Sequence, residues 1–210
     1  MTKYYDWKEE IKKEELKQVT EILANDGIIV FPTETVYGIG GNALSESVID
    51  KVYDVKKRPR EKALNIILAD KADIEKYANI KYDIERKIIE KCMPGPITMI
   101  LEKKEQSFGD TFTQDDNTIG IRIPDSKIIH TILENVDFPL IAPSANISGK
   151  PGGVEISDIK KDFDGCVDVI IDGGRAKIAK PSTIVKVINN EIVILREGEI
   201  TKEDIIELIK

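Results

Sequence analysis

GIIVFPTETVYGIGGNA (residues 27–43) begins as a short apolar run and continues into hydroxyls and glycines. Residues 27–31 predict a buried strand, which Pro32 ends. The side chains at 33–35 would then lie at the carboxyl end of that strand, where α/β folds tend to bind ligands. The glycines that follow allow another backbone to approach closely. The same pattern also fits an ordinary turn, in which glycine supplies the geometry and threonine caps the backbone.

A basic run, KKRPREK (56–62), lies between a predicted helix and a predicted strand. It can be the solvated end of the helix, where lysines complement the helix dipole. Pro59, however, ends the helix and fixes the turn, which places these positive groups near the same sheet edge as the threonines. There Arg58 could bind phosphate through its planar fork, and Lys56 and Lys62 could act as point charges.

A second polar segment, APSANISGKPGG (142–153), follows the apolar run PLIAP. Ser144, Asn146 and Ser148 offer short polar side chains on a turn, and the glycines keep the following backbone open. The alternative is an ordinary strand-to-helix loop built from Asx and Ser turns.

Arg122 is the one charged residue in the apolar strand pattern IGIRI (119–123). Burying it without a partner would be costly, so we expect an anion beside it. That anion is either structural, for which Glu34 and Asp125 are candidates, or a substrate carboxylate. Arg196, which closes a predicted hairpin strand, raises the same question.

The remaining pattern interleaves strands and helices. Helices are predicted over 9–25, 46–56 with Ser45 as N-cap, 71–78, 83–92, 126–135, and after a capping box at Thr201. Strands are predicted over 64–68, 97–101, 119–123, 139–143, 168–172, and as a hairpin over 182–197 that turns at Asn189-Asn190. We expect one α/β domain over residues 1–210, a twisted mixed sheet flanked by helices, with 103–117 as an exposed loop.

Composition limits the function classes. Hydrophobic residues make up 41% and charged residues 33% of the 210 residues, which is typical of a globular protein. The net charge of −7 argues against a protein that binds nucleic-acid backbone over a large surface. Two cysteines cannot form a disulfide framework, and no apolar run reaches the length of a membrane span. We therefore expect a cytoplasmic protein with no membrane partner.

Several familiar catalytic motifs are missing from the sequence. It has no GxxxxGK[ST] phosphate loop and no GxGxxG after a strand, and Ser144 does not lie in GxSxG. The single histidine, His130, is interpreted as structural or surface, so no metal site is predicted. Catalysis would have to rest on positioning and electrostatics. From the residues alone, we expect a cationic, hydroxyl-rich cleft that is suited to a nucleotide and a small anion.

At these residues the chain closely resembles the YrdC/Sua5 family of threonylcarbamoyladenylate synthases. The resemblance is carried, in family order, by FPTETVYGIGGNA, Lys56-x-Arg58, MPGPIT (93–98), IGIRIP (119–124), APSANISGKP with its SxN element, PSTIV (181–185) and LREG (195–198). The short stretch after LREG resembles the single-domain form of the family. The resemblance implies a YrdC-like fold with a concave basic cleft.

The resemblance further implies a nucleotidyltransferase that converts L-threonine, bicarbonate and ATP to L-threonylcarbamoyladenylate and pyrophosphate, with Mg²⁺ accompanying ATP. The product would pass to a separate transferase complex that modifies adenosine 37 of tRNA, and direct contact with tRNA would be weak or absent. One alternative is a non-catalytic RNA- or nucleotide-binding module. Another is the carbamoyl-adenylating module of hydrogenase maturation, which normally carries zinc-finger-like cysteines that are missing here.

The family motifs also imply roles for individual residues. Threonine would be held by Thr35, Arg122, the backbone at Ala142, and Ser182. ATP would be held by Arg58, Lys62, Thr118, Ser144, Gly152 and Arg196. Catalysis would depend on Lys56, Arg58, Ser144 and Asn146, the KxR and SxN elements. The chain departs from many relatives at Ile67, where they carry a substrate-contacting histidine, at Ala63, and at Gly152.

Overall fold

The computed structural model describes residues 1–104, 108 and 117–210, so most of the loop predicted at 103–117 lies outside the described residues. Within the described residues the strands form two mixed sheets. The four-stranded sheet has the order β1 (Lys3–Asp6), β9 (Val169–Asp172), β2 (Ile29–Phe31) and β3 (Gly38–Gly40). The seven-stranded sheet has the order β11 (Glu191–Arg196), β10 (Thr183–Ile188), β6 (Ile97–Lys103), β7 (Thr118–Arg122), β4 (Asn65–Ile67) and β8 (Leu140–Ile141), with β5 (Ala78–Asn79) also paired to β6.

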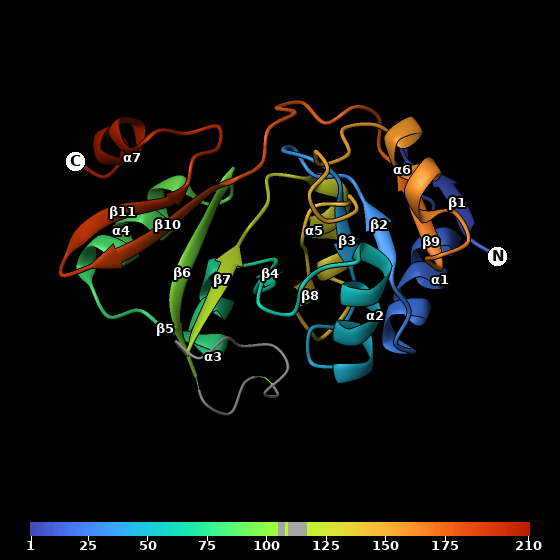
Figure 1. Cartoon of the computed structure of the whole chain (residues 1–210), viewed down its shortest axis with the longest axis horizontal. Helices are drawn as coiled ribbons and strands as arrows, with labels where there is room; N and C mark the ends of the chain where they lie inside the picture. The colour runs from blue at the N-terminus through green and yellow to red at the C-terminus, as the bar shows by residue number, and fades with distance from the viewer. Residues whose placement is uncertain (105–107, 109–116) are drawn as a thin grey trace.

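Parallel and antiparallel pairs occur in both sheets. In the smaller sheet β9 runs parallel to β1 and to β2, and β3 is antiparallel to β2. In the larger sheet β6 and β10 are parallel, as are β4 and β7, whereas β6 and β7 are antiparallel. Figure 1 shows the two sheets on opposite sides of the molecule, with the N-terminus beside the smaller sheet and the C-terminus beside the larger one.

Helices cover these sheets. They are α1 (Lys13–Ala24), α2 (Glu46–Lys56), a 3₁₀ turn (Lys71–Asp73), α3 (Ile74–Tyr77), α4 (Asp83–Cys92), α5 (Lys127–Leu133), α6 (Ile156–Phe163) and α7 (Lys202–Leu208). The predicted mixed α/β class is confirmed. The Ser45 N-cap is also confirmed, because its side chain accepts a hydrogen bond from the Val48 amide, and so is the capping box at Thr201.

Four of the described elements were not predicted: β1, β3, β5 and α6. Among the described strands β1 pairs with β9 alone, and because β9 lies far away in sequence, no local pattern predicts β1. The same pairing continues at Trp7, whose amide donates to the Asp172 carbonyl at 2.8 Å, and this explains why α1 begins at Lys13 rather than at residue 9. β3 has the sequence GIG, which the prediction interpreted as part of a turn.

The apolar faces of the predicted elements form the core. Val48, Ile49, Val52 and Tyr53 of α2 are buried, as their helical spacing predicted. The hairpin turn is also confirmed, because Asn189 and Asn190 both have positive φ, as tight two-residue hairpin turns require.

The two sheets meet where β3 approaches β8. Isolated bridges pair Gly38 with Ser144 and Asn42 with Leu140. Gly40 makes the closest approach, because a Cβ built there would lie 1.7 Å from the Ile141 carbonyl oxygen. A side chain at position 40 would therefore push the sheets apart.

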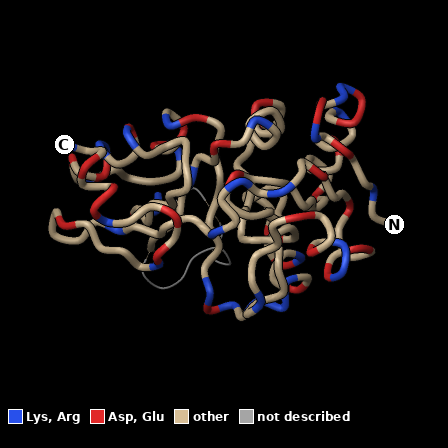
Figure 2. The backbone as a smooth tube through the Cα atoms, turned by 90° about the horizontal axis from the view of Figure 1, so that it is seen from above, with Lys and Arg blue, Asp and Glu red and all other residues tan. Residues whose placement is uncertain are grey.

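Along the described backbone, positions of Lys and Arg are interspersed with positions of Asp and Glu (Figure 2). Both cysteines are free, Cys92 in the core and Cys166 at the surface. Among the described residues, no helix combines the length and the apolar character that crossing a membrane requires.

We predict that Gly40→Ala lowers the free energy of unfolding by more than about 3 kcal/mol, because both partners in the clash belong to backbone that is fixed by pairing. Gly165→Ala is the matched control: its φ is +77° but nothing lies within 4 Å of the new methyl group. It should cost only about 1 to 2 kcal/mol, the strain of a left-handed alanine. Urea unfolding of both variants tests this, and equal losses would contradict the proposed close contact.

Candidate functional site

A cavity of about 200 Å³ opens where the two sheets meet. Eight of the predicted site residues line it: Thr35, Arg58, Thr118, Arg122, Ala142, Ser144, Ser182 and Arg196. They come from the β2–β3 turn, the end of α2, β7, the segment after β8, and the β10–β11 hairpin. The fold thus brings together polar segments that are far apart in sequence.

Backbone hydrogen bonds fix the first polar segment against the second. The Ile39 amide donates to the Pro143 carbonyl at 3.0 Å, and the Ala145 amide donates to the Tyr37 carbonyl at 2.7 Å. Thr35 is held from its own turn, because its hydroxyl lies 2.9 Å from the Thr33 hydroxyl. These bonds set the position of the cavity wall before any ligand arrives.

The charged residues that line the cavity are three arginines: Arg58, Arg122 and Arg196. Arg58 donates from Nε and Nη2 to the carbonyls of Lys62 and Ala63, at 3.0 and 2.7 Å. Arg196 donates to the carbonyl and hydroxyl of Ser182, at 2.7 and 3.1 Å from Nη2. Carbonyl oxygens orient the guanidinium groups without neutralising them, which suits the cavity to an anion.

The arginines also affect one another. Burial lowers the pKa of Arg58. The pKa of Arg196 is lowered by burial first, and then by repulsion from Arg122 and Arg58. Arg196 is thus close enough to Arg122 and Arg58 to be repelled by both, and the described lining of the cavity contains no acidic residue, which favours binding of an anion.

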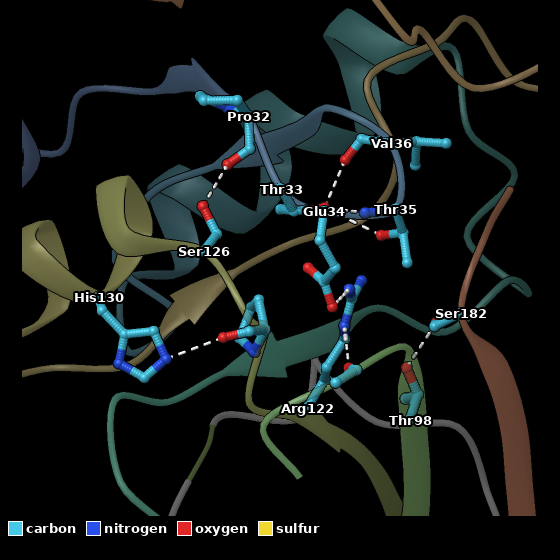
Figure 3. A network of polar contacts seen from close by, with 12 residues as sticks. Pro32, Thr33, Glu34, Thr35, Val36, Thr98, Arg122, Ser126, His130 and Ser182 are labelled. Carbon is cyan, nitrogen blue, oxygen red and sulfur yellow. Dashed lines mark hydrogen bonds and ion pairs between the residues drawn. The ribbon is translucent and has the colours of Figure 1, made fainter. Parts of the chain in front are cut away.

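Arg122 has a structural partner, and that partner is Glu34. Its Nη2 lies 2.6 Å from Glu34 Oε1, and its Nε donates to the Gly95 carbonyl at 3.2 Å (Figure 3). Both side chains are more than 90% buried. Burial lowers the pKa of Arg122, and Glu34 opposes that shift. Of the two partners that the sequence suggested, the structure selects Glu34, since the salt bridges of the described residues do not join Arg122 to Asp125.

Lys56 lies just behind the cavity and is 1% exposed. Its Nζ donates to the carbonyls of Ser144 and Asn146, at 2.5 and 2.7 Å, and lies 3.5 Å from Asn146 Oδ1. The Ser144 hydroxyl donates to the same Oδ1 at 2.5 Å. Lys56 of the KxR element and the SxN residues therefore form one hydrogen-bonded unit, in which Lys56 and Asn146 shape the turn that presents Ser144.

Burial, followed by repulsion from Arg58, lowers the pKa of Lys56 to about 7. The three oxygen acceptors oppose this shift, because an ammonium group has three N–H donors to offer them. A charged Lys56 thus fits its acceptors well but is penalised by its surroundings.

Other predicted residues lie apart from the cavity. Lys62 is exposed, and it is its carbonyl, rather than its ammonium group, that contacts Arg58. Gly152 packs against Val36, 3.3 Å from where a Cβ would lie, and does not line the cavity. His130 lies in α5 and contacts the Pro124 carbonyl at 2.8 Å, in keeping with a structural role. Two of the three departures from the family pattern, Ile67 and Ala63, do line the cavity.

Thr98 is a cavity residue that the sequence analysis did not single out. Its hydroxyl lies 2.8 Å from that of Ser182, and both side chains are buried. The signal was present in MPGPIT, where Thr98 is a polar residue inside an otherwise apolar strand. The described residues contain no group of three or more His, Cys, Asp or Glu side chains that could hold a metal.

We predict that Lys56→Met reduces the pH dependence of stability between pH 7 and pH 10. In that window the unfolded chain keeps Lys56 protonated and the folded protein does not, so the free energy of unfolding of the wild type should rise with pH. The contribution is at most about 1.4 kcal/mol per pH unit, and it disappears below the folded pKa. Urea unfolding at several pH values tests this, and parallel curves for the two proteins would contradict it.

Comparison with known proteins identifies the family to which a chain with this site belongs. The family model Sua5_yciO_yrdC, described as telomere recombination, matches residues 21–198. A relative from Methanocaldococcus jannaschii is 43% identical over 198 residues, which cover 94% of this chain and 92% of the relative. A Bacillus subtilis relative named threonylcarbamoyl-AMP synthase is 33% identical, over 91% of this chain and 55% of its own length.

A solved structure gives the same result. The crystal structure of Pyrococcus abyssi Sua5 complexed with L-threonine superposes with a TM-score of 0.92 at 31% identity. The match covers 100% of this chain and 61% of that protein, so this chain spans about three fifths of its length. The matched segment contains all the cavity residues described above. The chain therefore belongs to the Sua5/YciO/YrdC family.

Proposed function

We propose that this protein synthesises L-threonylcarbamoyladenylate from L-threonine, bicarbonate and ATP, with release of pyrophosphate, for the threonylcarbamoyl modification of tRNA adenosine 37. The observation that carries the proposal is the convergence of Arg58, Arg122 and Arg196 on one cavity lined by hydroxyls. The family supports it, since a relative is named threonylcarbamoyl-AMP synthase and a structural neighbour was solved with L-threonine.

The reaction has two steps. The threonine amine first combines with bicarbonate to give a carbamate and water. A carbamate oxygen then forms a bond to the α-phosphorus of ATP while the bond from that phosphorus to the bridging oxygen breaks, and pyrophosphate leaves with the electron pair. Such a transfer needs charge neutralisation and alignment more than a strong base. Mg²⁺ enters with ATP as part of the substrate.

The residues of the cavity match these needs. Arg58 and Arg196 have carbonyl and hydroxyl partners and so retain their full charge for the phosphates. Arg122 would take the threonine carboxylate, with Thr35 and Ser182 beside it. Lys56 and Asn146 act through the backbone of the Ser144 turn, which they hold in place. Lys62 and Gly152 have no direct role in this scheme, because neither lines the cavity.

The decisive experiment measures pyrophosphate release from Mg·ATP, with L-threonine and bicarbonate omitted in turn. Release that requires both establishes the reaction and its substrates together. Release without threonine would indicate another acceptor or simple ATP hydrolysis, and absence of release from the folded protein would contradict the proposal.

We predict that Arg58→Ala and Arg122→Ala separate the two substrates. Removing a charge aimed at the phosphates should lower kcat/KM for ATP by about 100-fold or more. Arg122→Ala should instead raise the KM for threonine by at least tenfold, roughly the effect of one lost charge-assisted contact. Steady-state assays with each substrate varied in turn measure both effects. Arg86→Ala, which removes an exposed pair with Glu75, is the control and should behave as wild type. Equal effects of Arg122→Ala on both substrates would show that Arg122 is misassigned.

A further inference from the structure

Only one of the three cavity arginines faces a carboxylate. Among the described residues, Glu34 lies 2.6 Å from Arg122, and no acidic side chain lies within salt-bridge distance of Arg58 or Arg196. The cavity is therefore electrically uneven. Arg58 and Arg196 are uncompensated, whereas Arg122 is paired with Glu34, which does not itself line the cavity.

Glu34 is fixed in this position by its surroundings. Its carbonyl accepts a hydrogen bond from the Ile178 amide at 2.9 Å, and the adjacent Thr33 hydroxyl donates to the Val36 carbonyl at 2.6 Å. In Figure 3 the Glu34 side chain extends from this turn toward the guanidinium group of Arg122. Arg122 is restrained in turn by the Gly95 carbonyl.

Among the described residues, Arg122 is the only cationic side chain within salt-bridge distance of the Glu34 carboxylate. Neither of its oxygens accepts a well-formed hydrogen bond from the described residues. A buried carboxylate in that state is costly, and a fold that needed only packing at this point would be served better by an apolar side chain. The reason for a charged residue at position 34 is therefore that it neutralises Arg122.

The charge pattern matches the charges of the two proposed substrates. An α-amino acid is a zwitterion with no net charge, whereas the phosphates of ATP and pyrophosphate are polyanions. A neutral Arg–Glu pair attracts polyanions weakly but still offers guanidinium N–H groups to a carboxylate, while two uncompensated arginines favour phosphate.

We propose that Glu34 is a specificity-determining residue, which neutralises Arg122 and so reserves that end of the cavity for a zwitterionic amino acid by keeping phosphate groups away from it. This inference rests on the proposed function. Without Glu34, Arg122 would be a third uncompensated cation beside Arg58 and Arg196, and pyrophosphate could extend across the threonine position. Glu34 thus acts by exclusion as well as by holding Arg122 in place.

Calorimetric titration of L-threonine, with and without saturating pyrophosphate, tests the proposal in the wild type, Glu34→Gln and Glu34→Asp. In the wild type pyrophosphate should change the Kd of threonine by less than about twofold. In Glu34→Gln it should raise that Kd by about tenfold or more, and pyrophosphate itself should bind more tightly. Glu34→Asp keeps the charge and should keep the exclusion of pyrophosphate, although a shorter side chain weakens threonine binding. Glu75→Gln, at the exposed pair with Arg86, is the charge-matched control and should behave as wild type.

Two results would overturn the inference: competition between pyrophosphate and threonine in the wild type, or the same response in Glu34→Gln as in the wild type. The first needs no variant, so the proposal stays testable even if Glu34→Gln fails to fold, which its circular dichroism spectrum would show. Failure of the proposed function has a different signature. The wild type would then bind no threonine, either with or without pyrophosphate, and threonine could not be the ligand of Arg122.

Discussion

The close approach of β3 to β8 is the constraint on which the rest of the site depends. Because Gly40 has no side chain, the Ile141 carbonyl can lie where a Cβ would otherwise be. The two sheets can then exchange backbone hydrogen bonds at Ile39 and Ala145. These bonds fix the threonine-rich turn against the Ser144 turn, although about a hundred residues separate them in the chain. The cavity is thus a consequence of backbone pairing, and its side chains are aimed by a rigid frame.

Burying so many cations costs stability, and the fold offsets this cost in different ways. Lys56 is surrounded by oxygen acceptors, Arg58 and Arg196 by carbonyls and a hydroxyl, and Arg122 by a carbonyl and Glu34. Carbonyl dipoles stabilise a charge without cancelling it, so the positive potential of the cavity remains. Donors that are already oriented need little reorganisation when a charged group arrives, and this is the main advantage of a preorganised polar site.

The sequence predicts most of the strands and most of the cavity residues, but not how the strands pair in space. Apolar runs that end in polar residues predicted the strands and most of the cavity lining, because both follow from local pattern. The strands divide into two sheets, and the smaller sheet includes β1 and β3. This arrangement depends on pairing between segments that are distant in sequence, which local pattern does not predict. Among the site residues, Lys62 and Gly152 lie near residues that line the cavity, yet proximity in sequence does not ensure that a residue itself faces the cavity. Thr98 was missed because its role depends on the hydroxyl of Ser182, which lies just before the neighbouring strand β10.

The repulsion among the arginines links stability to the proposed chemistry. The lowered pKa of Arg196 reflects the charges of Arg122 and Arg58 in addition to burial, so part of the folding free energy opposes this arrangement. A polyanion between Arg58 and Arg196 would relieve that repulsion, and binding energy that relieves strain in the protein favours the occupied state. Glu34 limits the same repulsion at the Arg122 end by a permanent, internal anion. In the proposed scheme, substrate phosphates neutralise Arg58 and Arg196, whereas Glu34 neutralises Arg122, and this difference lets the site hold two differently charged molecules.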